Sequence, residues 1–367
     1  MILCANPSAQ FLARQAEIEA AVLSVMRGNR YILGDEVAAF ESEFAGFIGV
    51  SHAVGVANGT DALELALRAL DIGPGDEVIT VSHTAVATVA AIEATGAAPV
   101  LVDVMQDHYT LNPSQLGEVL SPRTRAVIAV HLYGQAADLD AIGEFCSTHG
   151  LSLIEDVSQA HGATWKGKRL GSIGQVACFS CYPTKNLGGI GDAGLVTTND
   201  QDIAQRVRML REYGWRERYV SEFPGRNSRL DELQAAILRV KLRYLDVDNE
   251  RRWHLAEFYS EALAGLPVTL PLKRAGAKHV FHLYVLRCLR RQELFNYLKS
   301  EGIFAGIHYP LPVHLQPAYQ GRVRLAVDLT VTESLANEVL SLPMYPELEE
   351  FQLQRVVDAV RFWFSRH

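Results

Sequence analysis

The chain has 367 residues, a net charge of −8, 49% hydrophobic and 21% charged residues, which is the composition of a soluble globular protein. This acidic balance argues against a protein that binds nucleic-acid backbones, and no apolar run reaches the roughly 20 residues needed to span a bilayer. The N-terminus lacks the basic and long apolar segments of an export signal.

Five cysteines, an odd number in a chain of this length, do not form a disulfide framework. Cys178 and Cys181 have the spacing of a redox pair or of half a zinc site. A redox pair normally opens a helix, however, and zinc needs a second ligand pair at suitable spacing. The sequence shows neither, so we expect buried structural thiols, no metal and a cytoplasmic location.

The N-terminal part of the chain alternates between predicted strands and helices. Two helices come first, with apolar residues at helical spacing over 15–26 and 37–44. Strands follow at 52–56, 77–81, 99–104, 125–130 and 151–155, and helices at 60–70, 85–94, 113–120 and 139–149. This alternation predicts a mostly parallel α/β sheet with helices on both faces, which binds ligands at the carboxyl ends of its strands.

Two further strands are predicted at 175–180 and 193–198, separated by a glycine-rich loop. Long helical patterns then cover 202–213 and 230–254. After these the character changes, with a strand at 279–286 and helices at 292–301 and 356–364. We therefore expect a large domain over 1–249 and a smaller α+β domain over 250–367.

Lys185 lies in the loop between the last two strands of the large domain. Pro183 cannot donate to a sheet ladder, so the strand should end near it. An ammonium group held against an apolar wall loses hydration, which lowers its pKa and makes the amine a usable nucleophile. An ordinary surface lysine is the competing interpretation. Gly189, Gly191 and Gly194 also have dinucleotide-fingerprint spacing, but that fingerprint needs a strand before it and a helix after it, and here a loop precedes and a strand follows.

A candidate phosphate site, Asn58-Gly-Thr-Asp61, follows the first predicted strand and opens a helix. Gly59 allows close approach of the backbone, Thr60 offers a hydroxyl, and the helix N-terminus supplies free N–H groups and a positive dipole end. The other interpretation is that Asn58 or Thr60 simply caps the helix.

Asp156 follows the strand at 151–155, and a buried carboxylate needs a cation or hydrogen-bond donors. A protonated pyridine nitrogen, an arginine or a helix N-terminus would each serve. Gln159 and His161 are either polar neighbours in a site or satisfied core groups. A nucleophilic lysine, a carboxylate for a ring nitrogen and a helix phosphate pocket together describe a pyridoxal-phosphate site.

Several longer motifs then become recognisable together. They are Asn58-Gly-Thr-Asp-Ala-Leu63, His131-Leu-Tyr-Gly-Gln135, Glu155-Asp-Val-Ser-Gln-Ala-His-Gly-Ala163, Tyr182-Pro-Thr-Lys-Asn-Leu187 and Asn227-Ser-Arg-Leu-Asp-Glu-Leu-Gln-Ala-Ala236. With these motifs in this order, the chain resembles the nucleotide-sugar aminotransferases of the DegT/DnrJ group, within the fold-type I pyridoxal-phosphate enzymes. The likeness runs from Tyr31-Ile-Leu-Gly34 to His308-Tyr-Pro-Leu-Pro-Val-His314.

The resemblance implies a role for each matching residue. Lys185 would form the internal aldimine, Asp156 would hold the pyridine N–H, and Gln159 would lie by the ring hydroxyl. Gly59, Thr60 and Ser180 would bind the phosphate, with Asn227 reaching it from the other subunit of a homodimer. Tyr309 and His314 would lie near the sugar nucleotide. The family often has an aromatic residue after Ser-x-Thr that stacks on the cofactor ring, whereas this chain has Ala85, so the resemblance leaves that stacking to His83.

The resemblance predicts that an amino donor, L-glutamate, converts pyridoxal 5'-phosphate to pyridoxamine phosphate, which then aminates a nucleotide-linked keto sugar. Residues 82–88 and 227–232 are most similar to the subgroup that aminates C3 of dTDP-3-keto-6-deoxyhexoses. Two alternatives stay open: a C4 aminotransferase for a UDP-, dTDP- or GDP-4-keto sugar, and a non-catalytic sensor that keeps the fold. Dehydrating relatives carry histidine at the aldimine position, so Lys185 favours transamination.

Overall fold

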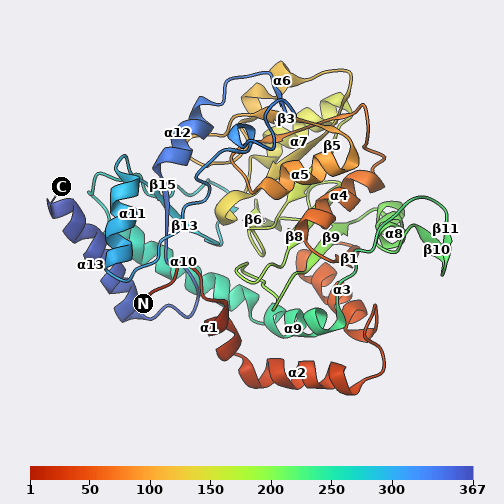
Figure 1. The fold of residues 1–367 in the computed structure, drawn as a ribbon, viewed down its shortest axis with the longest axis horizontal. Helices are drawn as coiled ribbons and strands as arrows, with labels where there is room; N and C mark the ends of the chain where they lie inside the picture. The colour runs from red at the N-terminus through yellow and green to blue at the C-terminus, as the bar shows by residue number, and fades with distance from the viewer. Residues whose placement is uncertain (367) are drawn as a thin grey trace.

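The computed structural model describes residues 1–366 and contains one large central sheet (Figure 1). Its strand order is β1-β9-β8-β5-β4-β2-β3-β14. These strands are His52–Val56 (β1), Gly194–Thr198 (β9), Val176–Ser180 (β8), Ser152–Asp156 (β5), Thr124–Val130 (β4), Glu77–Val81 (β2), Ala98–Val102 (β3) and Arg324–Leu325 (β14). Neighbours from β8 to β14 are parallel, whereas β9 is antiparallel to both β1 and β8. The prediction of a mostly parallel sheet is confirmed.

Helices connect these strands and cover the sheet. α4 (Gly59–Ala69) packs on β8 and β9, and α7 (Leu139–His149) packs on β4 and β5. α5 (Val86–Thr95) contacts α4 and β3, while α3 (Asp35–Ile48) and α8 (Gln201–Leu210) pack on β1. The strand β2 is buried along its whole length, as expected when helices cover both faces of a parallel sheet. One large hydrophobic core results.

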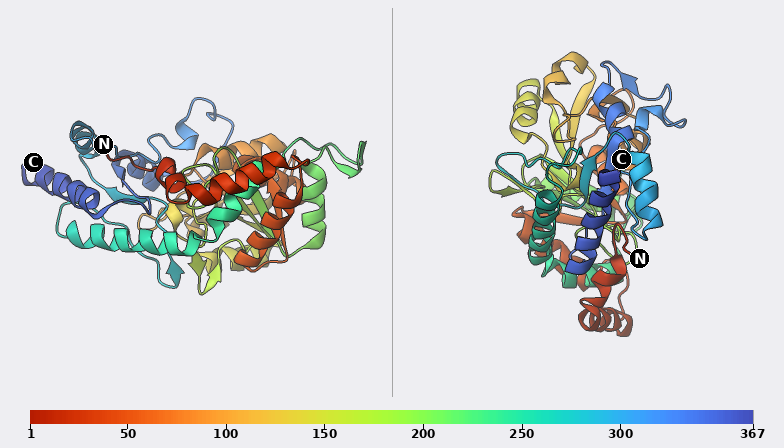
Figure 2. Two further views of the ribbon diagram at one scale, coloured as in Figure 1. Left: turned by 90° about the horizontal axis from the view of Figure 1, so that it is seen from below. Right: turned by 90° about the vertical axis from the view of Figure 1, so that its left-hand side faces the viewer.

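A second hydrophobic core lies at the end of the molecule where both termini are found (Figures 1 and 2). Its elements are α10 (Leu245–Ala262), α11 (Arg291–Ser300), α13 (Glu350–Arg366), and the antiparallel pair β13 (Tyr284–Arg287) and β15 (Val339–Leu342). α10 joins the two cores, because its Leu245 belongs to the first and its Leu255 to the second. The division into domains 1–249 and 250–367 stays a prediction, and α10 crosses it.

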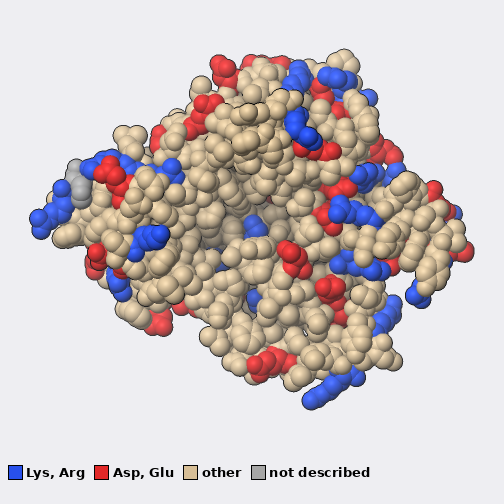
Figure 3. Space-filling view, in the orientation of Figure 1, with Lys and Arg blue, Asp and Glu red and all other residues tan. Residues whose placement is uncertain are grey.

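Several remaining elements are short. They are α1 (Pro7–Leu12), α6 (Leu116–Val119), α12 (Thr330–Glu338), β6 (Thr164–Trp165), β7 (Lys168–Arg169) and β12 (Ala277–Lys278). The hairpin of β10 (Trp215–Glu217) and β11 (Val220–Ser221) extends from the edge of the molecule (Figure 1). Acidic and basic side chains are interspersed over the face drawn in Figure 3. Within residues 1–366, no helix has the length and apolar character to cross a bilayer.

Two predicted elements need correction. The helical pattern over 230–254 forms two helices, α9 (Glu232–Leu242) and α10, with a break at residues 243–244. In the apolar run 279–286, only the end from Tyr284 onward is a strand. The backbone N–H groups of Val280 and Leu283 donate instead to the carbonyls of Gly134 and Tyr133, at 3.0 and 3.3 Å. Hydrogen bonding to another loop therefore replaces the ladder that the pattern predicts.

Glu232 fixes the start of α3 from another helix. Its carboxylate, which is almost completely buried, accepts hydrogen bonds from the backbone N–H groups of Gly34, Glu36 and Val37 at 2.6, 3.0 and 3.0 Å. The first N–H groups of a helix have no acceptor within the helix, and a negative charge there also interacts favourably with the helix dipole. Glu232 thus fixes the backbone around Gly34 to α9.

We expect Glu232→Ala to lower the free energy of unfolding by about 3 kcal/mol or more, because three backbone donors would lose a charged acceptor. Urea-induced unfolding measures this loss. Glu36→Ala is the matched control in α3, the helix whose start Glu232 holds, since Glu36 makes a half-exposed ion pair with Arg239 at 2.7 Å. That variant should lose less than about 1 kcal/mol. Equal losses in the two variants would contradict the proposed anchoring.

Candidate active site

A cavity of about 460 Å³ lies at the carboxyl ends of the parallel strands. Loops after β1, β2, β5 and β8 supply its walls, which is where a sheet of this kind binds ligands. Of the predicted site residues, those that line it are Gly59, Thr60, Asp156, Gln159, Ser180 and Lys185. The structure therefore gathers in one place residues that are far apart in the sequence.

One end of the cavity is formed by the first turn of α4. Asn58 caps this helix by accepting a hydrogen bond from Asp61 N at 2.8 Å, so the capping interpretation is correct for Asn58. The N–H groups of Gly59 and Thr60 open the helix, where no intrahelical acceptor exists. A Cβ atom on Gly59 would lie 2.5 Å from Ser180 Cβ, so glycine is required for this close approach. The result is an anion cradle of backbone N–H groups beside the Ser180 hydroxyl.

Asp156 ends β5 and directs a buried carboxylate toward the cavity. Its Oδ2 accepts a hydrogen bond from Thr88 Oγ1 at 3.0 Å, and its Oδ1 accepts one from Ser158 N at 3.2 Å. Thr88 in turn lies 3.0 Å from the hydroxyl of Thr84, which lines the cavity. These bonds fix the orientation of the carboxylate and leave it able to accept a further hydrogen bond from a ligand.

The neighbouring Glu155 points to the opposite side of β5 and is completely buried. The backbone N–H groups of Gly171, Ile173 and Gly174 donate to it at 2.9, 2.9 and 2.7 Å, and His131 Nε2 lies 3.1 Å away. Desolvation acts to raise the pKa of Glu155, but the hydrogen bonds from His131 and the backbone prevail and hold it below its ordinary value. Glu155 thus secures the strand that carries Asp156.

Lys185 is held in a tight turn after β8. Its N–H donates to Tyr182 O at 2.8 Å, and Gly189 N donates to Cys181 O at 2.8 Å. Removal from water lowers the pKa of Lys185 to about 8, although the nearby Asp156 acts to raise it. Near neutral pH a much larger fraction of this amine is therefore unprotonated than in an ordinary lysine, and the unprotonated form is the nucleophile.

Gln159 and Tyr309 meet at the side of the cavity. Gln159 Nε2 donates to the Tyr309 hydroxyl at 3.1 Å, and Gln159 Oε1 accepts from Tyr133 N at 2.8 Å. The sequence alone assigns no role to Tyr133, although this residue lies within the motif His131–Gln135. Its hydroxyl donates to His308 O and lies 2.8 Å from His83 Nε2. Tyr133 therefore connects the loop after β4 with the segment that carries Tyr309.

Four predicted site residues do not line this cavity, and one of them, Tyr309, contacts it only through Gln159. His83 is buried against Tyr133, and desolvation lowers its pKa to about 4, whereas Thr84 and Ala85 form the wall. His314 is bonded to Ser82 Oγ at 2.7 Å and lines a separate hollow beside α12. Asn227 is exposed on the segment before α9. The roles predicted for these residues are not visible in the single chain.

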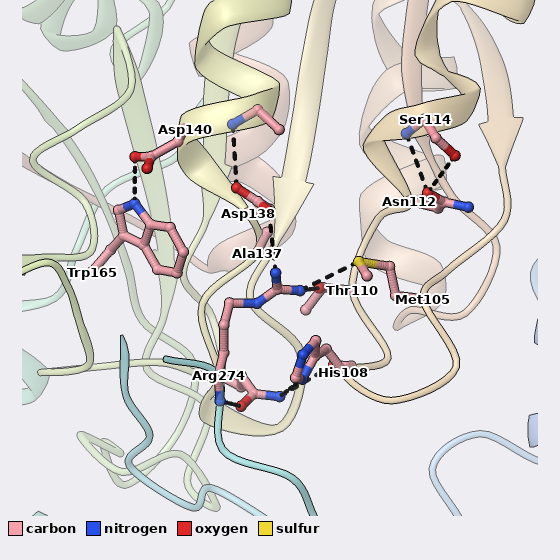
Figure 4. Close-up of polar contacts among 12 residues, drawn as sticks. Met105, His108, Thr110, Asn112, Ser114, Ala137, Asp138, Asp140, Trp165 and Arg274 are labelled. Carbon is pink, nitrogen blue, oxygen red and sulfur yellow. Dashed lines mark hydrogen bonds and ion pairs between the residues drawn. The ribbon is translucent and has the colours of Figure 1, made fainter. Parts of the chain in front are cut away.

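The loop after β4 is braced by Arg274 from the segment before β12 (Figure 4). The Arg274 guanidinium donates to Asp138 at 3.3 Å and to Thr110 at 3.4 Å, and its backbone N–H donates to Gln135 Oε1 at 3.1 Å. Asp138 also caps α7 through Ala141 N. These contacts hold the loop that presents Tyr133.

Cys178 and Cys181 are both completely buried, and neither forms a disulfide. Burial raises the pKa of the Cys181 thiol to about 12, so it is an unreactive thiol. Among residues 1–366, no group of three or more side chains is arranged to hold a metal ion. The expectation of buried structural thiols is confirmed.

Comparison with known proteins shows which family the chain belongs to. The model of the DegT/DnrJ/EryC1/StrS aminotransferase family matches residues 13–361. The chain belongs to this family. Its resemblance to the DegT/DnrJ group, inferred from the motifs, is thus confirmed, and so is the fold.

Individual relatives of this DegT/DnrJ/EryC1/StrS family member are close. The chain is 51% identical over 353 residues to dTDP-3-amino-3,4,6-trideoxy-alpha-D-glucose transaminase of Streptomyces venezuelae, covering 96% of this chain and 93% of the relative. The crystal structure of S. venezuelae DesV in complex with a ketimine intermediate superposes with a TM-score of 0.97 at 49% identity, covering 100% of this chain and 99% of that one. NtdA of Bacillus subtilis, solved with bound cofactor PMP, has a TM-score of 0.89 at 28% identity, covering 96% and 82%.

The cofactor of this aminotransferase is pyridoxal phosphate, and the cavity fits it. The opening N–H groups of α4 and the Ser180 hydroxyl suit a phosphate, and the buried Asp156 suits a protonated ring nitrogen. Lys185, with its lowered pKa, is the amine in the same cavity. The donor set therefore matches the three chemical features of the group.

Proposed function

We propose that this aminotransferase transfers the amino group of L-glutamate to C3 of a dTDP-linked 3-keto-6-deoxyhexose, for the synthesis of an amino-deoxysugar. The cavity that combines Lys185, Asp156 and the α4 anion cradle carries the proposal that the chain is catalytic. The choice of dTDP as the nucleotide and of C3 as the aminated carbon is supported by the S. venezuelae transaminase, which is similar along nearly the whole chain. The five free thiols support a cytoplasmic location.

Each residue of the cavity then has a task. Gly59, Thr60 and Ser180 would bind the phosphate, Asp156 would accept the ring N–H, and Gln159 would lie near the ring hydroxyl. Bound pyridoxal phosphate supplies an electron sink for the bond cleaved at the amino-bearing carbon. Lys185 Nζ would take the proton that leaves that carbon and deliver it to C4′ of the cofactor. Tyr309, bonded to Gln159, would lie near the sugar.

A substrate comparison tests this proposal. The purified protein, loaded with cofactor and L-glutamate, is offered a dTDP-3-keto-6-deoxyhexose or a 4-keto sugar linked to dTDP, UDP or GDP. We expect amino-sugar nucleotide from the 3-keto substrate, detected by mass spectrometry. Product from a 4-keto sugar alone would establish the C4 alternative. A protein that binds the cofactor but shows no turnover with any donor and acceptor would support the non-catalytic one.

We further propose that the active unit is a homodimer whose sites combine both chains. An apolar surface supports this, since Phe11, Val22, Leu23, Ile190 and Leu233 line a groove between α2 (Gln15–Arg27) and α9. Ile190 is 50% exposed, and Asp192, two residues further along the same loop, lines the cavity, so the groove and the cavity share this loop. Contiguous apolar surface at such a position is typical of a protein interface.

The segment before α9 supports the shared site. Arg226 makes ion pairs with Asp61 and Glu64 of α4, and Ser228 Oγ accepts from Ala57 N at 3.2 Å. Asn227 between them is exposed and does not line the cavity of its own chain. It is therefore available to a cofactor phosphate in the neighbouring subunit, where a hydrogen bond to a charged group contributes about 1.5–3 kcal/mol.

Mixed dimers test this sharing. Lys185→Ala and Asn227→Asp chains are each first shown to be inactive alone, and they are then unfolded together and refolded. In a mixed dimer, one site takes its lysine from the Asn227→Asp chain and its asparagine from the Lys185→Ala chain, so that site is intact. We expect up to about a quarter of wild-type activity, because half of the dimers are mixed and each has one intact site. Mixed dimers that form without activity would contradict the shared site.

A further inference from the structure

Two side-chain amides form a junction behind Lys185. Asn186, the next residue along the turn, is buried. Its Nδ2 donates to Asn249 Oδ1 at 2.7 Å and to Val280 O at 3.1 Å. Its Oδ1 lies 3.2 Å from His282 Nδ1. Because both amide hydrogens of Asn186 are used, the remaining contact requires that His282 Nδ1 carry the hydrogen and donate.

Asn249 extends this junction to the loop that carries Asp156. It lies on α10, is 2% exposed, and donates from Nδ2 to His161 O at 2.8 Å. Residues 156–163 form the loop that begins with Asp156 and includes Gln159. The two amides therefore connect the Lys185 turn to the Asp156 loop through a side chain on α10.

The packing around Asn249 is tight. Gly162 has a φ of +83°, and a Cβ atom at that position would lie 2.7 Å from Asn249 Nδ2. Glycine at 162 is thus needed both for the left-handed backbone and for the space that Asn249 occupies. The Asp156 loop and α10 consequently have little freedom to move relative to each other.

The segment that receives the Asn186 hydrogen bond also holds the loop after β4. Val280 N donates to Gly134 O at 3.0 Å, and the Arg252 guanidinium on α10 donates to Phe281 O at 3.3 Å and to His282 O at 3.4 Å. The loop around Gly134 presents Tyr133, whose N–H donates to Gln159. Asn186 is therefore bonded to structures that support the Asp156 loop and the loop that presents Tyr133.

We propose that Asn186, tied through Asn249 to α10 and to the Asp156 loop, is a positioning residue that sets the place of Lys185 relative to Asp156. This inference rests on the proposed function. A displacement of about 1 Å between reacting groups lowers rates by about 10²-fold, so a rigid connection between the two loops has catalytic value. Amide side chains make this connection without adding a charge beside the amine of Lys185.

The experiment compares Asn186→Ala in two backgrounds. With Lys185 present, we expect the apo variant to form its visible absorption band with added pyridoxal phosphate about 10–100-fold more slowly than wild type, and to lose a similar factor in kcat. In the Lys185→Ala background, Asn186→Ala should change cofactor affinity, measured by fluorescence quenching, by less than about 2-fold. A residue that acts through Lys185 has no effect once that lysine is absent.

Asn249→Ala is the second variant, to be used if Asn186→Ala does not fold. It removes the acceptor of the Asn186 hydrogen bond on α10, and we expect the same slow formation of the visible band. Tyr259→Phe is the control, because it removes another buried hydrogen bond, to Pro343 O at 3.0 Å, within the second core. It should lower the melting temperature and leave the rate of band formation at the wild-type value.

Asn186→Ala or Asn249→Ala proteins that have a lower melting temperature but form the band at the wild-type rate would overturn the inference. So would a loss of cofactor affinity well above about 2-fold when Asn186→Ala is made in the Lys185→Ala background. A wild-type protein without band or turnover would overturn the proposed function instead.

Discussion

Replacing Lys185 by alanine is expected to abolish amino transfer, with a loss of about 10³-fold or more in kcat. Under the proposed function, the variant loses both the nucleophilic amine and the group that moves the proton, and each of these contributions is large in enzymes. The fold should persist, because the turn is held by the backbone bonds of Lys185, Gly189 and their acceptors rather than by the side chain. Steady-state turnover and the visible absorption of the loaded protein measure the effect.

Lys241 provides a matched control for this prediction. Like Lys185 it has its pKa lowered to about 8, mainly by desolvation, but it donates to Gly188 O at 2.7 Å and does not line the cavity. Lys241→Met should lower stability while the visible band still forms. If Lys185→Ala retained the band and Lys241→Met lost it, the assignment of the reactive lysine would be wrong.

The lowered pKa of Lys185 should also make its reaction with added cofactor depend on pH. An amine attacks a carbonyl in its unprotonated form, so the rate at which Lys185 combines with added cofactor should rise about tenfold per pH unit below 8 and level off above it. Stopped-flow absorbance measures this profile. A midpoint near the ordinary lysine value of 10.5 would show that Lys185 is not desolvated in the free protein.

Asp156→Asn is expected to lower kcat by about 10²–10³-fold, the range found when one preorganised electrostatic group is removed from an active site. A neutral amide does not stabilise a protonated ring nitrogen as the carboxylate does, so the ring becomes a poorer electron sink. Cofactor affinity should also fall by about 10–100-fold, corresponding to the loss of a charge-assisted hydrogen bond.

The local structure should tolerate this change. In Asp156→Asn, Oδ1 still accepts from Ser158 N, and the hydroxyl of Thr88 accepts from the new amide in place of donating. The melting temperature of the apo variant should therefore stay close to that of wild type, and equilibrium dialysis separates the loss of affinity from the loss in kcat. Activity within a few-fold of wild type at saturating cofactor would contradict the role of Asp156.

The sequence by itself determined most of the sheet and pointed to two of the groups that line the cavity. Alternating buried strands and amphipathic helices are local patterns, because a strand covered on both faces is apolar along its length. β2 runs over the predicted residues 77–81, and α7 over 139–149. Lys185 and Asp156 were predictable as cavity residues for the same reason, since one lies in the loop after such a strand, the other at the end of one, and ligands bind at that edge of the sheet.

The tertiary structure alone decided which partners the polar groups find. His83 contacts Tyr133, which is 50 residues away along the chain. His314 contacts Ser82, which is 232 residues away. Only the folded chain brings these pairs together. Residues 279–283 have the apolar pattern of a strand, yet Val280 donates to Gly134 and His282 to Asn186. Hydrogen-bond acceptors contributed by distant loops override local propensity when both groups are buried, since a buried donor left without an acceptor costs about 1–3 kcal/mol. Such pairings depend on contacts that a linear pattern does not contain, and they set the positions of the side chains around Lys185.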